Sequence, residues 1–72
     1  MTKTEIRRYY AKHLGDHCGD RIVDIDFYNI CGDRYVNLLV VSSHHSVWRV
    51  TYRIVVDAGE EVLRYVNVTL LG

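Results

Sequence analysis

The sequence predicts a small α+β protein, an N-terminal helix packed on a four-stranded antiparallel sheet in the order α-β-β-β-β, as a meander. Three observations support this fold class. The chain starts with a helix-capping pattern and an apolar stripe of helical spacing, alternating apolar residues recur in later segments, and turn residues separate these segments. A chain of 72 residues forms one domain, which we place over residues 1–72.

The helix is predicted to begin at Thr2. Residues 2–5, Thr-Lys-Thr-Glu, have the spacing of a capping box, in which the Thr2 hydroxyl accepts from the Glu5 amide and Glu5 reaches back. Gly15 is the expected end. The apolar stripe consists of Ile6, Tyr9, Tyr10, His13 and Leu14. The rest of the helix surface is basic, with Lys3, Arg7, Arg8 and Lys12, and we interpret it as a solvated face rather than a phosphate-binding one.

Two strands follow. Residues 21–29 place Val23, Ile25 and Phe27 on one face and Asp24 and Asp26 on the other, which is typical of a half-buried strand. Residues 31–33 are expected to turn. Residues 35–43 carry apolar groups on both faces, so the second strand should be central in the sheet.

Residues 46–71 predict a long β-hairpin, because apolar and polar residues alternate through its first arm. We expect the loop to be residues 57–60, with a type I turn at Asp57 and Ala58 and with Gly59 in the left-handed conformation. This loop sets the register of the two arms. It places Ile54 opposite Val62, Tyr52 opposite Arg64, Val50 opposite Val66 and Trp48 opposite Val68.

One helix is too small to cover the predicted sheet. A twelve-residue helix measures about 18 by 10 Å, whereas four strands of nine or ten residues span roughly 32 by 19 Å. The uncovered face would therefore expose apolar side chains, which favours association with a protein, either a second copy or another chain, through that face or an edge strand. The alternative is a strongly twisted sheet that curls around the helix. The expected interface residues are Val47, Val55, Leu63, Tyr65 and Leu71.

Residues 52–63, YRIVVDAGEEVL, resemble the strand–turn–strand ending of PepSY domains, where an apolar strand leads through Val-Asp-Ala into a Gly-Glu-Val turn. The chain departs from that pattern because it has no polar residue between Ala58 and Gly59. More broadly, a helix wrapped by a four-stranded meander is similar to the cystatin-like arrangement. Both resemblances imply binding rather than catalysis.

Arg64 interrupts an otherwise apolar row in this register. Its guanidinium can stack on the Tyr52 ring and extend past the helix to solvent. Alternatively, it forms an anion or small-molecule site between helix and sheet, with Tyr52 and Trp48 as walls and Tyr10 nearby. The second interpretation is our alternative function, a small-molecule or anion-binding protein.

Metal binding and catalysis are weakly supported. The soft ligands His13, His17, Cys18 and Cys31 do not have the spacing of a zinc motif, and Gly15 interrupts the helix that would align the histidines. We expect no metal and no cofactor. His17 and Cys18 are adjacent, and neighbours in sequence rarely form a nucleophile–base pair.

Other polar groups also have simple explanations. Asp24 and Asp26 are expected to be solvated acids that pair with arginines of a neighbouring strand, rather than a divalent-ion or acid–base site. His44 and His45 lie in a predicted exposed turn, with a pH-sensitive edge contact as the alternative.

Composition narrows the function classes. Nine basic and nine acidic side chains balance, so we expect neither nucleic acid nor a membrane surface as a partner. No apolar signal segment is visible, so we expect a cytoplasmic protein with reduced thiols, whereas a secreted fragment would favour a Cys18–Cys31 disulfide. The prediction is a non-enzymatic protein-interaction module, a homodimer or homo-oligomer, an inhibitor or an adaptor.

Overall fold

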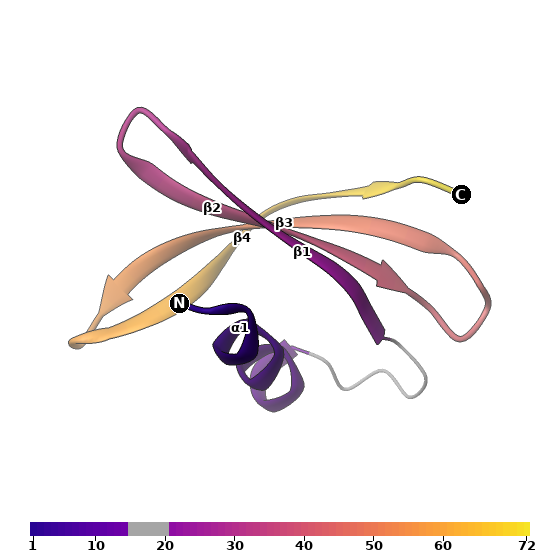
Figure 1. Cartoon of the computed structure of the whole chain (residues 1–72), viewed down its shortest axis with the longest axis horizontal. Coiled ribbons are helices and arrows are strands. Elements are labelled where there is room, and N and C mark those ends of the chain that lie inside the picture. The colour runs from indigo at the N-terminus through magenta and orange to yellow at the C-terminus, as the bar shows by residue number, and fades with distance from the viewer. Residues whose placement is uncertain (15–20) are drawn as a thin grey trace.

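The computed structural model describes residues 1–14 and 21–72 and has an α+β architecture (Figure 1). The sheet order is β1-β2-β3-β4 and all neighbours are antiparallel, so the predicted helix and four-stranded meander are confirmed. The elements are α1 (Lys3–Tyr9), the π-helical turn η1 (Tyr10–Leu14), β1 (Arg21–Ile30), β2 (Asp33–Val41), β3 (Val47–Asp57) and β4 (Glu60–Leu70).

The predicted capping box starts α1. The Glu5 amide donates to Thr2 Oγ1 at 3.2 Å, and the Thr2 amide donates to Glu5 Oε1 at 3.0 Å. Hydrogen bonds to the Glu5 carboxylate, first from the Thr2 amide and then from the Thr2 side chain, hold the pKa of the Glu5 carboxyl below its usual value. The α-helix ends at Tyr9 and continues as the π-helical turn, and the predicted stop at Gly15 lies outside the described residues.

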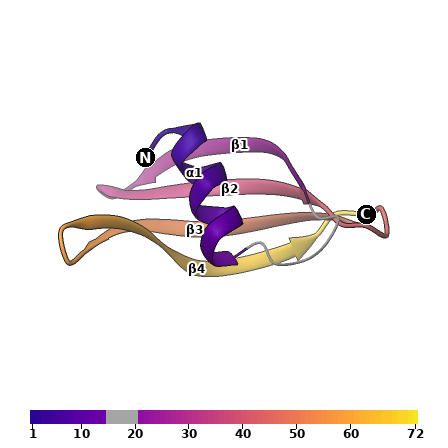
Figure 2. The ribbon, with the colours of Figure 1, turned by 90° about the horizontal axis from the view of Figure 1, so that it is seen from below.

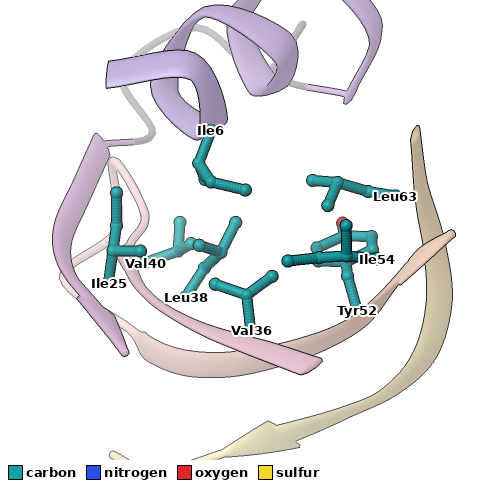
Figure 3. Close-up of a cluster of buried hydrophobic side chains, with 8 residues drawn as sticks. All are labelled: Ile6, Ile25, Val36, Leu38, Val40, Tyr52, Ile54 and Leu63. Atoms are coloured by element: carbon teal, nitrogen blue, oxygen red, sulfur yellow. The ribbon is translucent and has the colours of Figure 1, made fainter. Parts of the chain in front are cut away.

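The helix runs across the strands on one face of the sheet (Figure 2), and Ile6 is its fully buried side chain. The strongly twisted sheet curves around this residue (Figure 3). Ile6 belongs to a cluster with side chains from every strand, and its other members are Ile25, Val36, Leu38, Val40, Tyr52, Ile54 and Leu63. Every second residue of β2 from Val36 to Val40 belongs to this cluster, which agrees with the predicted central position of that strand.

The β3–β4 hairpin has a tighter loop than the sequence predicts. Asp57 pairs with Glu60, so the loop contains only Ala58 and Gly59, and both have positive φ, 52° and 81°. This geometry is that of a type I′ turn, which matches the twist of the two strands. The β1–β2 hairpin turns in the same way at Cys31 and Gly32, with φ of 51° and 83°.

The shorter loop makes the predicted register wrong by one residue at the start of β4. Ile54 pairs with Leu63 rather than Val62, and Tyr52 pairs with Tyr65 rather than Arg64. A shift of one residue moves each side chain to the other face of the sheet. Leu63 and Tyr65 therefore lie on the face that carries Ile6, and Arg64 lies on the opposite one.

A bulge then restores the predicted faces farther along β4. The pairing shifts between Thr51 and Tyr52, which leaves Val66 as an extra residue, and Val68 pairs with Val50. A second bulge lies in β1 between Ile22 and Asp24, so Val23 has no partner on β2. Each of the two edge strands therefore has one bulge.

Polar contacts tie the start of the chain to the sheet. The amino group of Met1 forms an ion pair with Glu61 Oε1 at 2.7 Å, and Arg34 pairs with the other carboxylate oxygen. These bonds, first that from the amino group and then that from Arg34, hold the pKa of the Glu61 carboxyl below its usual value. Arg7 Nη1 also donates to the Ile22 carbonyl at 3.0 Å.

Candidate protein-interaction surface

The free edge of β4 is the most apolar exposed part of the described chain. β4 ends the sheet order, so within the described residues it pairs with β3 alone. Residues 65–71, the uncharged run, contain no charged side chain and no glycine or proline. Most of them are exposed, with Tyr65 at 62%, Val66 at 45%, Val68 at 44%, Leu70 at 56% and Leu71 at 49%.

The backbone of this run also has unused hydrogen-bonding groups. The Leu71 amide donates to the Val47 carbonyl at 2.7 Å, so the backbone N–H of Leu71 is directed toward β3. Because backbone groups alternate in direction along an antiparallel strand, Leu70 and Val68 direct theirs to the free edge. An uncharged, exposed edge of this kind is a template for a further strand.

The other edge strand, β1, is protected. Asp24 and Asp26 alternate along its centre, and both are exposed. Charged side chains and bulges on an edge strand discourage pairing with another chain. Of the two edges, β4 is therefore the one that is suited to pairing.

The open face, which is the sheet face opposite Ile6, is polar at its centre. Asn37, Thr51 and Asn67 lie side by side on β2, β3 and β4. Thr51 is only 7% exposed, and its hydroxyl donates to Asn37 Oδ1 at 2.6 Å. This arrangement satisfies the buried hydroxyl, so the centre of the open face is not the apolar surface that the sequence predicts.

Charged side chains of both signs lie around the polar centre of the open face. The carboxylates of Asp24, Asp26 and Asp33 lie on β1 and β2, and the guanidinium groups of Arg49, Arg53 and Arg64 lie on β3 and β4. Arg53 Nη2 pairs with Asp33 Oδ1 at 2.8 Å. Arg53 also stands directly opposite Arg64. Like charges in that position repel, which favours solvent over close packing at this place.

Two hollows mark the open face. One of about 420 Å³ lies against Tyr28 and Tyr35, whose rings stack at 5.4 Å, and against Asn37 and Thr51. The other, of about 250 Å³, is lined by Asp24, Asp26 and Arg49 among others. The predicted pairing of these aspartates with arginines of a neighbouring strand is not found, because Arg49 lies on β3, two strands from β1, and forms no ion pair with Asp24 or Asp26.

The expected interface residues divide between the two faces. Val47 and Val55 are half-buried on the open face, and Leu71 lies near Leu39 in the smaller hollow. Leu63 is only 7% exposed and belongs to the core cluster, and Tyr65 is exposed on the same side as Ile6. The expectation that all five share the open face is wrong, because the shorter hairpin loop shifts the pairing of β3 with the start of β4 by one residue.

The structure brings together only Tyr10 and Tyr52 of the alternative ligand site and places Arg64 on the other face. Tyr52 is buried and Tyr10 packs against the core, whereas Arg64 is exposed on the opposite face. Burial raises the pKa of the Tyr52 hydroxyl, followed in size by the effect of Tyr10, so this group stays neutral at pH 7. Trp48 is half-buried and pairs with Leu70. The predicted stacking of Arg64 on Tyr52 is also wrong, for the same reason of register.

The residues considered for metal binding or catalysis lie apart where they are described. His13 is exposed and contacts the Tyr9 ring at 4.6 Å, and Cys31 is exposed in the β1–β2 turn. His17 and Cys18 lie outside the described residues. Within residues 1–14 and 21–72, no three His, Cys, Asp or Glu side chains gather closely enough to hold a metal ion.

The turn that contains His44 and His45 is organised by Ser42. The Ser42 hydroxyl accepts from the His44 and Ser46 amides at 3.3 and 3.2 Å, and His45 has a φ of 64°. Both histidines are exposed, as the sequence predicts. A pH-sensitive contact at this turn stays a prediction.

Sequence reasoning missed Val66, Val68 and Leu70 as surface residues. It placed Val66 and Val68 on the helix-facing side of the hairpin and did not name Leu70. A usable signal was present, because residues 65–71 form an uncharged β-prone stretch without glycine at the end of the last predicted strand.

Comparison with known proteins identifies no relative of this chain. The chain matches no protein-family model, no curated protein and no solved structure. The resemblance to PepSY and cystatin-like domains therefore stays a prediction. Among the described residues, neither helical segment has the length and apolar character needed to cross a membrane.

Proposed function

We propose that this chain is a non-enzymatic protein-interaction module that binds an extended segment of a partner along the free edge of β4. The observation that carries the proposal is the uncharged run 65–71, exposed on an edge strand whose outer backbone groups have no partner strand in the described chain. The partner segment becomes a fifth strand. Backbone hydrogen bonds then give affinity, and alternate side chains give specificity.

The apolar side chains matter more to this binding than the backbone bonds. Each new hydrogen bond contributes about 0.5–1.5 kcal/mol net, because it replaces bonds to water. Association itself costs about 4–15 kcal/mol in lost freedom. Val68 and Leu70 are roughly half exposed, and full burial of such a side chain contributes about 1.5–3 kcal/mol. Strand addition is therefore favourable where the edge is apolar, which selects β4 over β1.

The helix takes no part in this binding. We place it against the sheet through Ile6, with Arg7 and the Met1 amino group as polar ties, so that the helix side of the sheet centre is closed. The polar centre of the open face stays in contact with solvent. Only the edge then combines apolar exposure with free backbone groups.

Two valine variants with matched exposure test the proposal. Val68 and Val23 are 44% and 47% exposed, and they lie on β4 and β1 respectively. The probe is a fluorescent peptide with the sequence of residues 64–72 and lysines at both ends for solubility, and binding is followed by anisotropy. We expect binding to the natural chain and to Val23→Lys, and a large loss with Val68→Lys, because the lysine places a charge in the apolar edge.

Circular dichroism of both variants shows whether the fold is kept. The proposal is wrong if the natural chain does not bind the peptide, or if Val68→Lys keeps its fold and binds as well as Val23→Lys.

A further inference from the structure

We propose that the segment bound by β4 is β4 of a second copy, in antiparallel orientation, with the two-fold axis at Val68. This inference rests on the proposed function, because it uses the same edge, and it adds the identity and the register of the partner. The product is a symmetric dimer with one continuous eight-stranded sheet. A two-fold interface of this kind needs a surface that is complementary to itself.

The uncharged run meets this requirement about Val68. In antiparallel pairing around that residue, Val68 faces Val68 of the second copy, and Asn67 faces Thr69 of the second copy. With Val66 kept as the bulge, Leu70 then faces Tyr65 of the second copy. Apolar groups meet on the helix side of the sheet and polar groups meet on the open face. Aliphatic and aromatic cross-strand pairs of this kind are favourable.

Repulsion between arginines disfavours a second arrangement of the dimer, in which the two-fold axis lies at Arg64. With the axis at Arg64, the two Arg64 side chains would lie directly opposite each other, and each copy already has Arg53 beside that position on β3. Such an arrangement places four guanidinium groups together, and like charges directly opposite are destabilising.

A third arrangement, with the axis at Val62, pairs Glu60 with Arg64 of the second copy and is favourable in charge. It aligns only residues 60–64, however, and leaves Val68 and Leu70 exposed. Pairing about Val68 covers the uncharged run and puts no charged residue opposite another. Apolar burial therefore favours the axis at Val68.

The contact is short, since eight residues of paired strand extend about 27 Å. We therefore expect a dimer that dissociates on dilution rather than a permanent one. Light scattering after gel filtration, over about a hundredfold range of concentration with reducing agent present, should show a mass that rises from monomer to dimer.

Cysteine cross-linking tests the register. In a background with Cys18→Ser and Cys31→Ser, a single cysteine is introduced as Val68→Cys, Val62→Cys or Val23→Cys, and a short bismaleimide joins thiols that face each other. We expect Val68→Cys to form covalent dimers at least about tenfold faster than the other two, because a residue on the axis lies next to its own copy. Fastest cross-linking of Val62→Cys would overturn the inference and favour the axis at Val62.

The outcomes separate this inference from the proposed function. A natural chain that stays monomeric at every concentration, or cross-linking at Val68→Cys no faster than at Val23→Cys, overturns the self-pairing. The proposed function survives either result if the lysine-flanked peptide still binds the natural chain and not Val68→Lys. If the peptide also fails to bind, both are wrong.

Discussion

The two edge strands of this sheet differ in charge rather than in length or regularity. β1 has ten residues and β4 has eleven, each contains one bulge, and each exposes a valine to a similar extent. Only β1 carries charges through its centre, at Asp24 and Asp26. β4 has charged residues before Tyr65 and none from there to its end. The comparison indicates that exposure does not identify a binding edge unless the charges that protect an edge are also missing.

Removal of the charges from β1 should have the largest effect. We expect the double variant Asp24→Val and Asp26→Val to convert dimers into large assemblies, because each molecule would then have two adhesive edges and sheets could add without closing. Light scattering measures the change in mass. The matched control is Asp24→Asn with Asp26→Asn, which removes charge but keeps polarity and should assemble less. Dimers that are unchanged in the valine variant would show that charge does not protect β1.

Two neighbours on β4 should separate folding from association. Leu63→Ala removes a side chain of the core cluster and should lower the free energy of unfolding by about 2–5 kcal/mol, as measured by urea denaturation. Tyr65→Ala removes a side chain that is 62% exposed. It also removes the edge-to-face contact with the Tyr52 ring, so it should lower stability by about 0.5–1.5 kcal/mol while it weakens dimerisation. Equal losses of stability in the two variants would contradict the register at the start of β4.

The pattern of capping, apolar and turn residues was sufficient to predict the helix, the four strands and their order in the chain. The capping box at Thr2 and Glu5, the alternation of β3 and the apolar character of β2 each predict the structure that is found, because each depends on residues close in the chain. The helix end was less predictable, since a π-helical turn follows Tyr9.

The hairpin register was not predictable in the same way. Alanine rarely adopts positive φ, so Asp57 and Ala58 favour a type I turn, yet the structure places Ala58 at 52°. The tighter loop brings Leu63 to the core and Arg64 to solvent, and these placements offset the free-energy cost of the positive φ at Ala58. The bulge at Val66 then reverses the shift, so Val68 and Leu71 lie on the faces that the sequence predicts. The alternation of side chains therefore predicted the wrong sheet face only between the turn and the bulge, where Leu63 and Tyr65 lie.

The start of β4 should also respond to acid. The pKa of the Glu61 carboxyl lies below its usual value, since the Met1 amino group and then Arg34 donate hydrogen bonds to the ionised form. A carboxyl whose pKa is lower in the folded than in the unfolded state stabilises the fold at pH values above the unfolded pKa. That contribution is lost as the pH falls through the folded pKa.

We therefore expect the thermal midpoint of the natural chain to fall as the pH is lowered from about 5, and Glu61→Gln to show a smaller fall over the same range. This effect should be smaller than those of the β1 aspartate variants and of Leu63→Ala, because the Glu61 side chain is 32% exposed and water weakens such ion pairs. Arg34→Met removes only the second partner and should lie between the two. Parallel curves for the natural chain and Glu61→Gln would mean that the ion pair does not anchor the start of β4, so that this strand would depend on the hairpin turn and on Leu63 alone to keep its edge in place.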